Sequence, residues 1–106
     1  ILINPSVTEA FGNVNLEAMG SGLAIVAADV DSAAALIDHG CSGLLAPAKD
    51  AAAFASAAEM LIRDCPRRRQ MAQTAHERAS RYRWADILDT VFGRYQHCVR
   101  NHRSAC

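Results

Sequence analysis

An uninterrupted apolar run, LAIVAA at residues 23–28, constrains the fold of this chain more than any other stretch. Gly22 and Asp29 bound it on either side. A strand without polar alternation is typical of the centre of a parallel sheet, where helices cover both faces. The run therefore predicts an α/β fold in which a sheet has helices on both sides.

Shorter strands and several helices are expected around this central strand. Residues 1–4 and 43–46 have strand character, and a proline that cannot join a ladder follows each of them. Helical patterns occupy residues 13–20 and 33–38, a segment capped by Asp50, a segment with Pro66 in its first position, and residues 84–99. The apolar faces predicted for the three late helices are Phe54, Ala58, Leu61 and Ile62, then Met71, Ala75, Ala79 and Tyr82, then Trp84, Ile87, Leu88, Val91, Phe92, Tyr95 and Val99.

Three parallel strands are too few for a complete doubly wound sheet. The chain also begins inside a strand and without a methionine, so we expect it to be a piece of a longer protein. Residues 1–106 are therefore predicted to form one unit, a partial Rossmann-like parallel sheet with flanking helices. No stretch approaches the roughly 20 apolar residues that a membrane span needs.

The net charge of the chain is zero, but its two halves differ. Residues 1–59 hold seven acidic residues against Lys49, and residues 60–106 hold ten arginines against four acidic residues. The halves therefore carry −6 and +6. A basic half suits nucleic acid or an anionic membrane surface. Because aromatic and basic residues do not interleave as in RNA-binding proteins, we expect solvated helix faces, no nucleic-acid partner, and at most peripheral contact with a membrane.

The four cysteines form no C-x-x-C pair and no disulfide-scaffold spacing, which indicates reduced thiols in a cytoplasmic protein. Cys98, His102 and Cys106 are spaced to share a helix face and could together touch zinc. They lie within the last nine residues, however, where helices fray, so we expect no metal site.

Two acidic residues, Glu9 and Glu17, flank a Phe-Gly-Asn turn. On one continuous helix, eight residues at about 100° each would leave the two side chains roughly 80° apart. Gly12 removes that constraint, so that Glu9 lies in the loop after the first strand and Glu17 about one turn into the helix. Both can then point into the crevice at the carboxyl ends of the strands, where open α/β sheets bind ligands.

The same turn exposes the backbone N–H groups of a helix N-terminus, from Gly12 to Val14, which suits a phosphate. A carboxylate at Glu17 suits a vicinal diol, as acidic residues bind ribose. Glu9 could then accept hydroxyl groups of a second sugar. These features predict recognition of a nucleotide sugar, although two acids at this spacing are also compatible with a solvated loop and helix surface.

The run NPSVTEAFGNVNLEAMGSGLAIVAADV at residues 4–30 resembles the E-x7-E region of the retaining GT-B glycosyltransferases, the large glycosyltransferase group 1 or family 4. LIDHGCSGLLAPAKDAAAFASAAEMLIRD and RYRWADILDTVFGRYQ resemble the rest of that family's C-terminal domain. The resemblance extends from Ile3 to about Tyr95. It implies that the chain is the second half of the C-terminal domain of a GT-B fold.

The resemblance also implies a function. In the full-length protein, a hexose would pass with retention from an NDP-sugar donor to a glycan, lipid or small-molecule acceptor, without a metal or other cofactor. The donor would sit between this domain and an N-terminal domain that the chain lacks, with the helix around residues 84–95 crossing back to it. Such enzymes of carbohydrate biosynthesis are expected in the cytoplasm or at the inner face of the membrane.

Site residues carry over from the family motif. Glu17 matches the glutamate that binds the donor ribose, and Glu9 matches the catalytic one that contacts the transferred sugar near its anomeric centre. Phe11, Gly12 and Asn13 match the turn whose amides bind the donor sugar and diphosphate, and Val14 continues this donor-binding segment.

The chain departs from the family pattern in several places. Asp31, Ser32 and Ala35 stand where a Gly-Gly pair and a glutamate are usual, and Asn15 replaces a residue that is usually apolar. The arginine and lysine that bind the diphosphate belong to the absent half. Because lost charge stabilisation costs several kcal/mol of barrier, we expect the isolated chain to be inactive.

Two other readings remain open at this point. The chain could be a non-catalytic module, for nucleotide-sugar binding or protein interaction, derived from the same fold. It could also belong to a GT-B sugar-nucleotide epimerase. The four histidines are expected to be surface or helix residues rather than bases.

Overall fold

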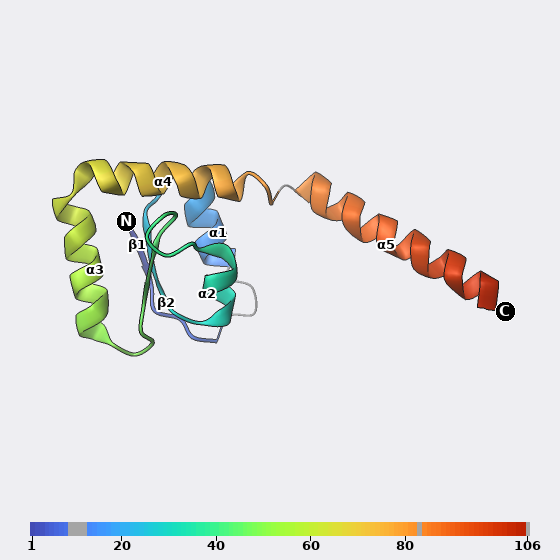
Figure 1. Cartoon of the computed structure of the whole chain (residues 1–106), viewed down its shortest axis with the longest axis horizontal. Coiled ribbons are helices and arrows are strands. Elements are labelled where there is room, and N and C mark those ends of the chain that lie inside the picture. The colour runs from blue at the N-terminus through green and yellow to red at the C-terminus, as the bar shows by residue number, and fades with distance from the viewer. Residues whose placement is uncertain (9–12, 83, 106) are drawn as a thin grey trace.

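The computed structural model describes residues 1–8, 13–82 and 84–105. Three parallel strands, β1 (Leu2–Asn4), β2 (Ile25–Ala28) and β3 (Leu44–Ala46), form a sheet in the order β1-β2-β3. The helices in the described residues are α1 (Asn13–Gly20), α2 (Asp31–Leu36), α3 (Ala51–Arg63), α4 (Cys65–Ala79) and α5 (Trp84–Ala105), as Figure 1 shows. This arrangement confirms the predicted α/β class with a parallel sheet and flanking helices.

Strand β2 lies in the middle of the sheet and is buried along its whole length. It pairs in parallel with β1, where Leu2 is opposite Ile25, and with β3, where Leu44 is opposite Val26. Ile25 faces a core formed with α1, α2 and α4, whereas Val26 faces a second core formed with α3 and α4. The apolar run therefore packs on both faces of the sheet, as its lack of alternation predicted.

Helix α4 contributes to both cores and so joins the two faces of the sheet. Ala75 packs with Met19 of α1 on one face, and Met71 packs with Leu61 of α3 on the other. The helix runs across the edge of the sheet where the strands begin, close to the chain's N-terminus (Figure 1). The opposite edge, where the strands end, is therefore left to the connecting loops.

Helix ends follow the capping signals of the sequence. Asp50 accepts a hydrogen bond from the Ala53 N–H at 3.0 Å, which confirms it as the cap of α3. Gly22 has φ of 77° and ends α1 in a Schellman arrangement, in which the Gly22 and Leu23 N–H groups donate to Met19 and Ala18 carbonyls. One cap was not predicted. Asp64 caps α4, so Pro66 is the second residue of that helix and not the first.

Two details of the predicted helices are wrong. Helix α2 begins at Asp31, two residues before the predicted start, because an acid in the first turn interacts favourably with the helix dipole. It ends at Leu36, because Ile37 is buried and has an extended backbone. On α3, Phe54 and Leu61 face the sheet as predicted, but the Ile62 side chain is 64% exposed because it lies to the outer side of that face.

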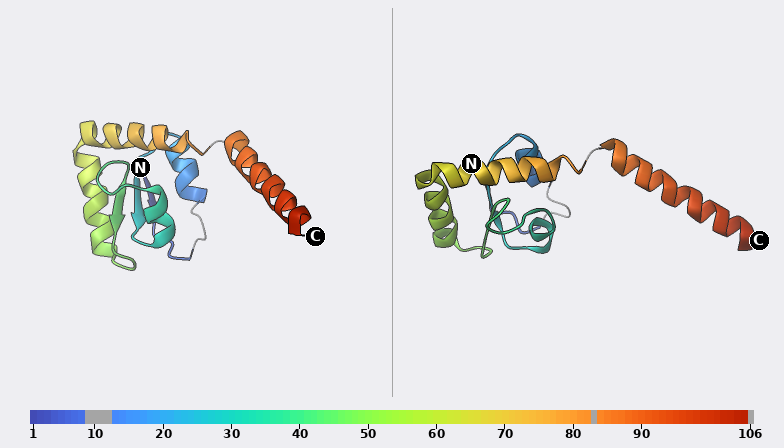
Figure 2. Two further views of the ribbon diagram at one scale, coloured as in Figure 1. Left: turned by 45° about the vertical axis from the view of Figure 1, so that its right-hand side comes forward. Right: turned by 45° about the horizontal axis from the view of Figure 1, so that its top comes forward.

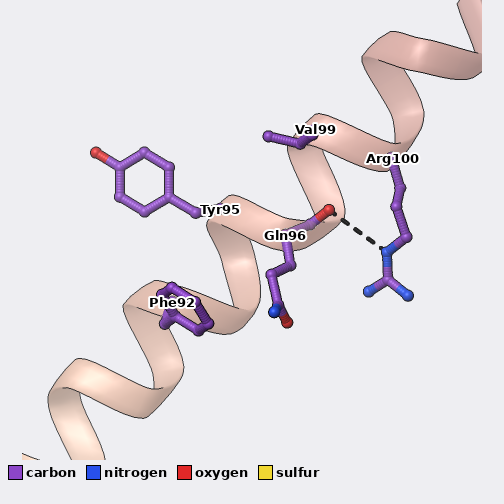
Figure 3. Close-up of a pocket in the computed structure, with 5 residues that line it drawn as sticks. All are labelled: Phe92, Tyr95, Gln96, Val99 and Arg100. Carbon is purple, nitrogen blue, oxygen red and sulfur yellow. Dashed lines mark hydrogen bonds between the residues drawn. The ribbon is translucent and has the colours of Figure 1, made fainter.

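The apolar side of α5 is not part of a core. Tyr95 is 68% exposed and Phe92 is 65% exposed, so the apolar face predicted for this helix is uncovered within the described residues. Figures 1 and 2 show the physical reason: α5 extends away from the sheet instead of folding back on it. In Figure 3, Phe92, Tyr95 and Val99 follow one another along the helix next to Gln96 and Arg100. By contrast, Tyr82 packs partly buried against the core as predicted, and the side chain of Trp84 lies outside the described part.

No helix among the described residues is both long and apolar enough to cross a membrane.

Gly43 gives a test of the packing around β2. A Cβ at this position would lie 2.9 Å from Ile37 Cγ2 and 3.1 Å from the Ile25 carbonyl oxygen, whereas one at Gly93 would meet nothing within 4 Å. We expect Gly43→Ala to lower the free energy of unfolding by about 1–3 kcal/mol, measured by urea denaturation. Gly93→Ala, the matched control on α5, should not lower it, because alanine is the better helix former. Equal losses in the two variants would contradict this packing.

Candidate functional site

Helix α1 has one buried face and one face turned to solvent. Asn15, Ala18 and Met19 are buried. At about 100° per residue, the exposed Asn13, Val14 and Glu17 lie within an arc of roughly 100° on the other side. The three described candidate residues therefore share one exposed face near the start of the helix.

The Glu17 carboxylate has the properties of a binding group without a structural role. It is exposed, and no hydrogen bond or ion pair of its side chain occurs within the described residues. Because a carboxylate offers two acceptor oxygens, it can accept hydrogen bonds from a pair of adjacent hydroxyl groups. Glu9, Phe11 and Gly12 lie outside the described residues, so their predicted roles stay predictions.

A pair of asparagines lies behind this face, and sequence reasoning missed it as a unit. Asn4 Nδ2 at the end of β1 donates to Asn15 Oδ1 at 2.9 Å, and Asn15 is only 2% exposed. Asn4 Oδ1 also accepts a hydrogen bond from the Ser6 N–H at 3.2 Å. The available signal was polarity, since Asn15 stands at a position where an apolar residue was expected.

Other loops at the same edge of the sheet carry charge. Asp29 and Asp31 follow β2 and are exposed, so this part of the edge is acidic and lacks the glycines of the family pattern. Lys49, in the loop after β3, has φ of 61° and lines a largely apolar groove with Ile3 and Phe54. Lys49 is the basic residue nearest to the strand ends within the described loops.

Two histidines, His39 and His76, form hydrogen bonds that connect parts of the fold. The Leu45 N–H donates to His39 Nδ1 at 2.9 Å, which ties the loop before β3 to that strand. His76 Nδ1 lies 3.0 Å from the Gly20 carbonyl oxygen, so its N–H donates to the end of α1. These contacts support the expectation that neither residue is a base.

Within the described residues, no three His, Cys, Asp or Glu side chains gather closely enough to hold a metal ion. Cys41, Cys65 and Cys98 are free thiols. Cys106, the third member of the zinc arrangement considered above, lies outside the described part, so the prediction of no metal stays a prediction.

Comparison with known families decides the relationship. The profile described as "Glycosyl transferases group 1" matches residues 1–64, more than half of the chain. The chain belongs to this family. The D-inositol 3-phosphate glycosyltransferase of Stackebrandtia nassauensis is 36% identical over 96 residues, which cover 91% of the chain and 22% of that protein. The chain thus spans about a fifth of the length of this relative.

Solved structures agree with the family match. Sucrose-phosphate synthase from Thermosynechococcus elongatus superposes with a TM-score of 0.88 at 28% identity, over 93% of this chain and 25% of that one. The Anabaena protein Alr3699/HepE, in complex with UDP and glucose, gives a TM-score of 0.83 at 26% identity over 88% of this chain and 25% of its own. These similarities confirm the predicted family and the fold, that of the C-terminal domain of GT-B glycosyltransferases.

The geometry of Glu17 yields a prediction about stability. Since its carboxylate has no partner in the described structure and alanine favours helices, Glu17→Ala should change the free energy of unfolding by less than about 0.5 kcal/mol. Met19→Ala, two residues further along α1 and fully buried, should cost about 2–5 kcal/mol in the same thermal or urea unfolding experiment. A large loss in Glu17→Ala would mean that this residue supports the fold.

Proposed function

We propose that this chain is the donor-binding part of a retaining glycosyltransferase that uses an NDP-sugar. The observation that carries the proposal is the exposed, unpartnered Glu17 on the same face of α1 as Asn13 and Val14. Support comes from the family match and from the similar Anabaena protein, whose structure is described as a complex with UDP and glucose.

Each residue has a role in this proposal. The N–H groups at the start of α1, at Asn13 and Val14, bind the diphosphate, because a helix N-terminus attracts anions. Glu17 accepts hydrogen bonds from the two ribose hydroxyls. Glu9 contacts the transferred sugar near its anomeric centre, and Phe11 and Gly12 shape the turn. These last three roles and the retention of configuration rest on the resemblance to the family motif, as does the absence of a metal or other cofactor.

The rest of the enzyme lies outside this chain, which spans 22% of the relative from Stackebrandtia. In the proposal, an N-terminal domain binds the acceptor, a glycan, lipid or small molecule, and closes over the donor. The exposed apolar side of α5 packs on that part of the full-length protein, which explains why Phe92 and Tyr95 remain uncovered here. The free thiols fit a cytoplasmic location, with peripheral membrane contact through the basic helices as a further part of the proposal.

The alternative functions have less support. An epimerase of the same fold is not favoured, because the matched relatives carry transferase names. A non-catalytic module is not favoured either, because the matched family and the matched relatives are named as glycosyltransferases.

The donor site is tested by titrating UDP, UDP-glucose and a GDP-sugar into the intact parent protein by calorimetry. We expect binding to one nucleotide class, weakened about 10- to 100-fold by Glu17→Ala, because hydrogen bonds to a charged group contribute about 1.5–3 kcal/mol. Glu59→Ala is the matched control, since Glu59 is an exposed helical glutamate that pairs only with Arg63. Unchanged affinity in Glu17→Ala would refute the assignment.

The isolated chain should bind donor weakly and turn it over at no detectable rate. It holds neither the acceptor domain nor the cationic residues that would stabilise the leaving diphosphate, and such charge stabilisation supplies several kcal/mol of rate acceleration. A coupled assay for released UDP, run beside the intact parent, measures this. Turnover by the purified 106-residue chain would show that its own residues suffice.

A further inference from the structure

The side chain of Asn4 makes two hydrogen bonds that hold the ends of one loop. Its Oδ1 accepts from the Ser6 N–H at 3.2 Å, which forms a local turn directly after β1. Its Nδ2 donates to Asn15 Oδ1 at 2.9 Å in α1, eleven residues along the chain. One amide group therefore fixes both the departure of the chain from the strand and its return in the helix.

The chain between the two asparagines is the segment that matters for the proposed donor site. It leads into the exposed Asn13 and Val14 at the start of α1. Glu17 follows Asn15 by two residues, so its direction depends on how α1 is rotated about its own axis. Any shift of α1 against β1 would move the described binding residues together.

Apolar packing alone would leave that rotation less sharply defined. The buried face of α1 otherwise consists of Ala18 and Met19, and contacts of this kind are non-directional. A hydrogen bond between two amides is directional, and at a site as buried as Asn15 water competes with it weakly. A directional hydrogen bond between the partly buried Asn4 and the buried Asn15 thus favours one arrangement of helix against strand.

We propose that Asn4 and Asn15 are positioning residues of the donor site. Their hydrogen bond sets the rotation and height of α1 against the end of β1, and through it the direction in which Asn13, Val14 and Glu17 face the nucleotide sugar. This inference rests on the proposed function, and it adds two residues that do not themselves touch the donor.

Two substitutions remove the bond in different ways. Asn15→Leu keeps the branched shape and the number of side-chain heavy atoms but removes the acceptor. Asn4→Asp keeps the acceptor for the Ser6 N–H and removes the donor toward α1. The matched control is Asn101→Leu, which removes an asparagine hydrogen bond to His97 near the far end of α5.

Calorimetric titration of the intact parent protein with the nucleotide sugar that it binds, well below the unfolding temperature, decides the matter. Each single variant should weaken binding about tenfold. The double variant should weaken it no further than the single variant with the larger effect, because both substitutions remove the same interaction. In a Glu17→Ala background the effect of Asn15→Leu should become smaller, because the part that acts through Glu17 is gone and only the part that acts through the Asn13 and Val14 N–H groups remains. A general loss of stability would not produce that dependence on Glu17.

Two results would overturn the inference. The first is wild-type affinity in both Asn15→Leu and Asn4→Asp. The second is an equal loss with and without Glu17, which would mean that the pair does not position the Glu17 carboxylate.

A second measurement keeps the inference separate from the proposed function. If the wild-type parent binds no nucleotide sugar, the proposed function fails, and hydrogen exchange then tests the positioning alone. Amides of residues 6–8 and 13–16 should exchange at least severalfold faster in both variants, while those of β2 stay unchanged. Identical exchange in wild type and variants would refute the role of the pair.

Discussion

The burial of β2 on both faces is the constraint on which the sheet and four of the helices depend. Its side chains alternate between two cores, and each core recruits its own helices, α1 and α2 on one side and α3 on the other. Because α4 reaches both cores, the two layers cannot shift independently. Exposed residues of α1, such as Asn13 and Glu17, are held in place by this packing through the helix that carries them.

The strands, the end of α1, the cap of α3 and the family were predictable because they depend on local or strongly periodic signals. The apolar run of β2 predicts a strand buried on both faces, and Asp50 and Gly22 are of residue types that are typical of helix ends. The exposure of Tyr95 was not predictable, because an apolar stripe indicates that something covers it without saying whether the cover belongs to the same chain. The start of α2 was misplaced because no side chain caps it, and an acid in the first turn, here Asp31, is a weaker signal than a cap.

The candidate site divides in the same way. Glu17 could be placed on an exposed helix face from spacing and from the family motif, and the structure agrees. The contact between Asn4 and Asn15 could not, since it joins a strand end to a helix and depends on the tertiary placement of both. A polar residue where an apolar one is expected indicates that such a contact exists, but it does not show which residue is the partner.

The position of α4 has a consequence for how this domain can change. Helix α4 joins the two faces of the sheet at the edge where the strands begin. The same helix carries His76, which is hydrogen-bonded to the end of α1. At the opposite edge, Asn4 holds the chain after β1 and Asp50 caps α3 after β3, whereas Asp29 and Asp31 after β2 are exposed and make no side-chain hydrogen bond or ion pair within the described residues. A protein engineer could therefore graft a new recognition segment onto the end of β2 while leaving the amino-end edge of the sheet unchanged.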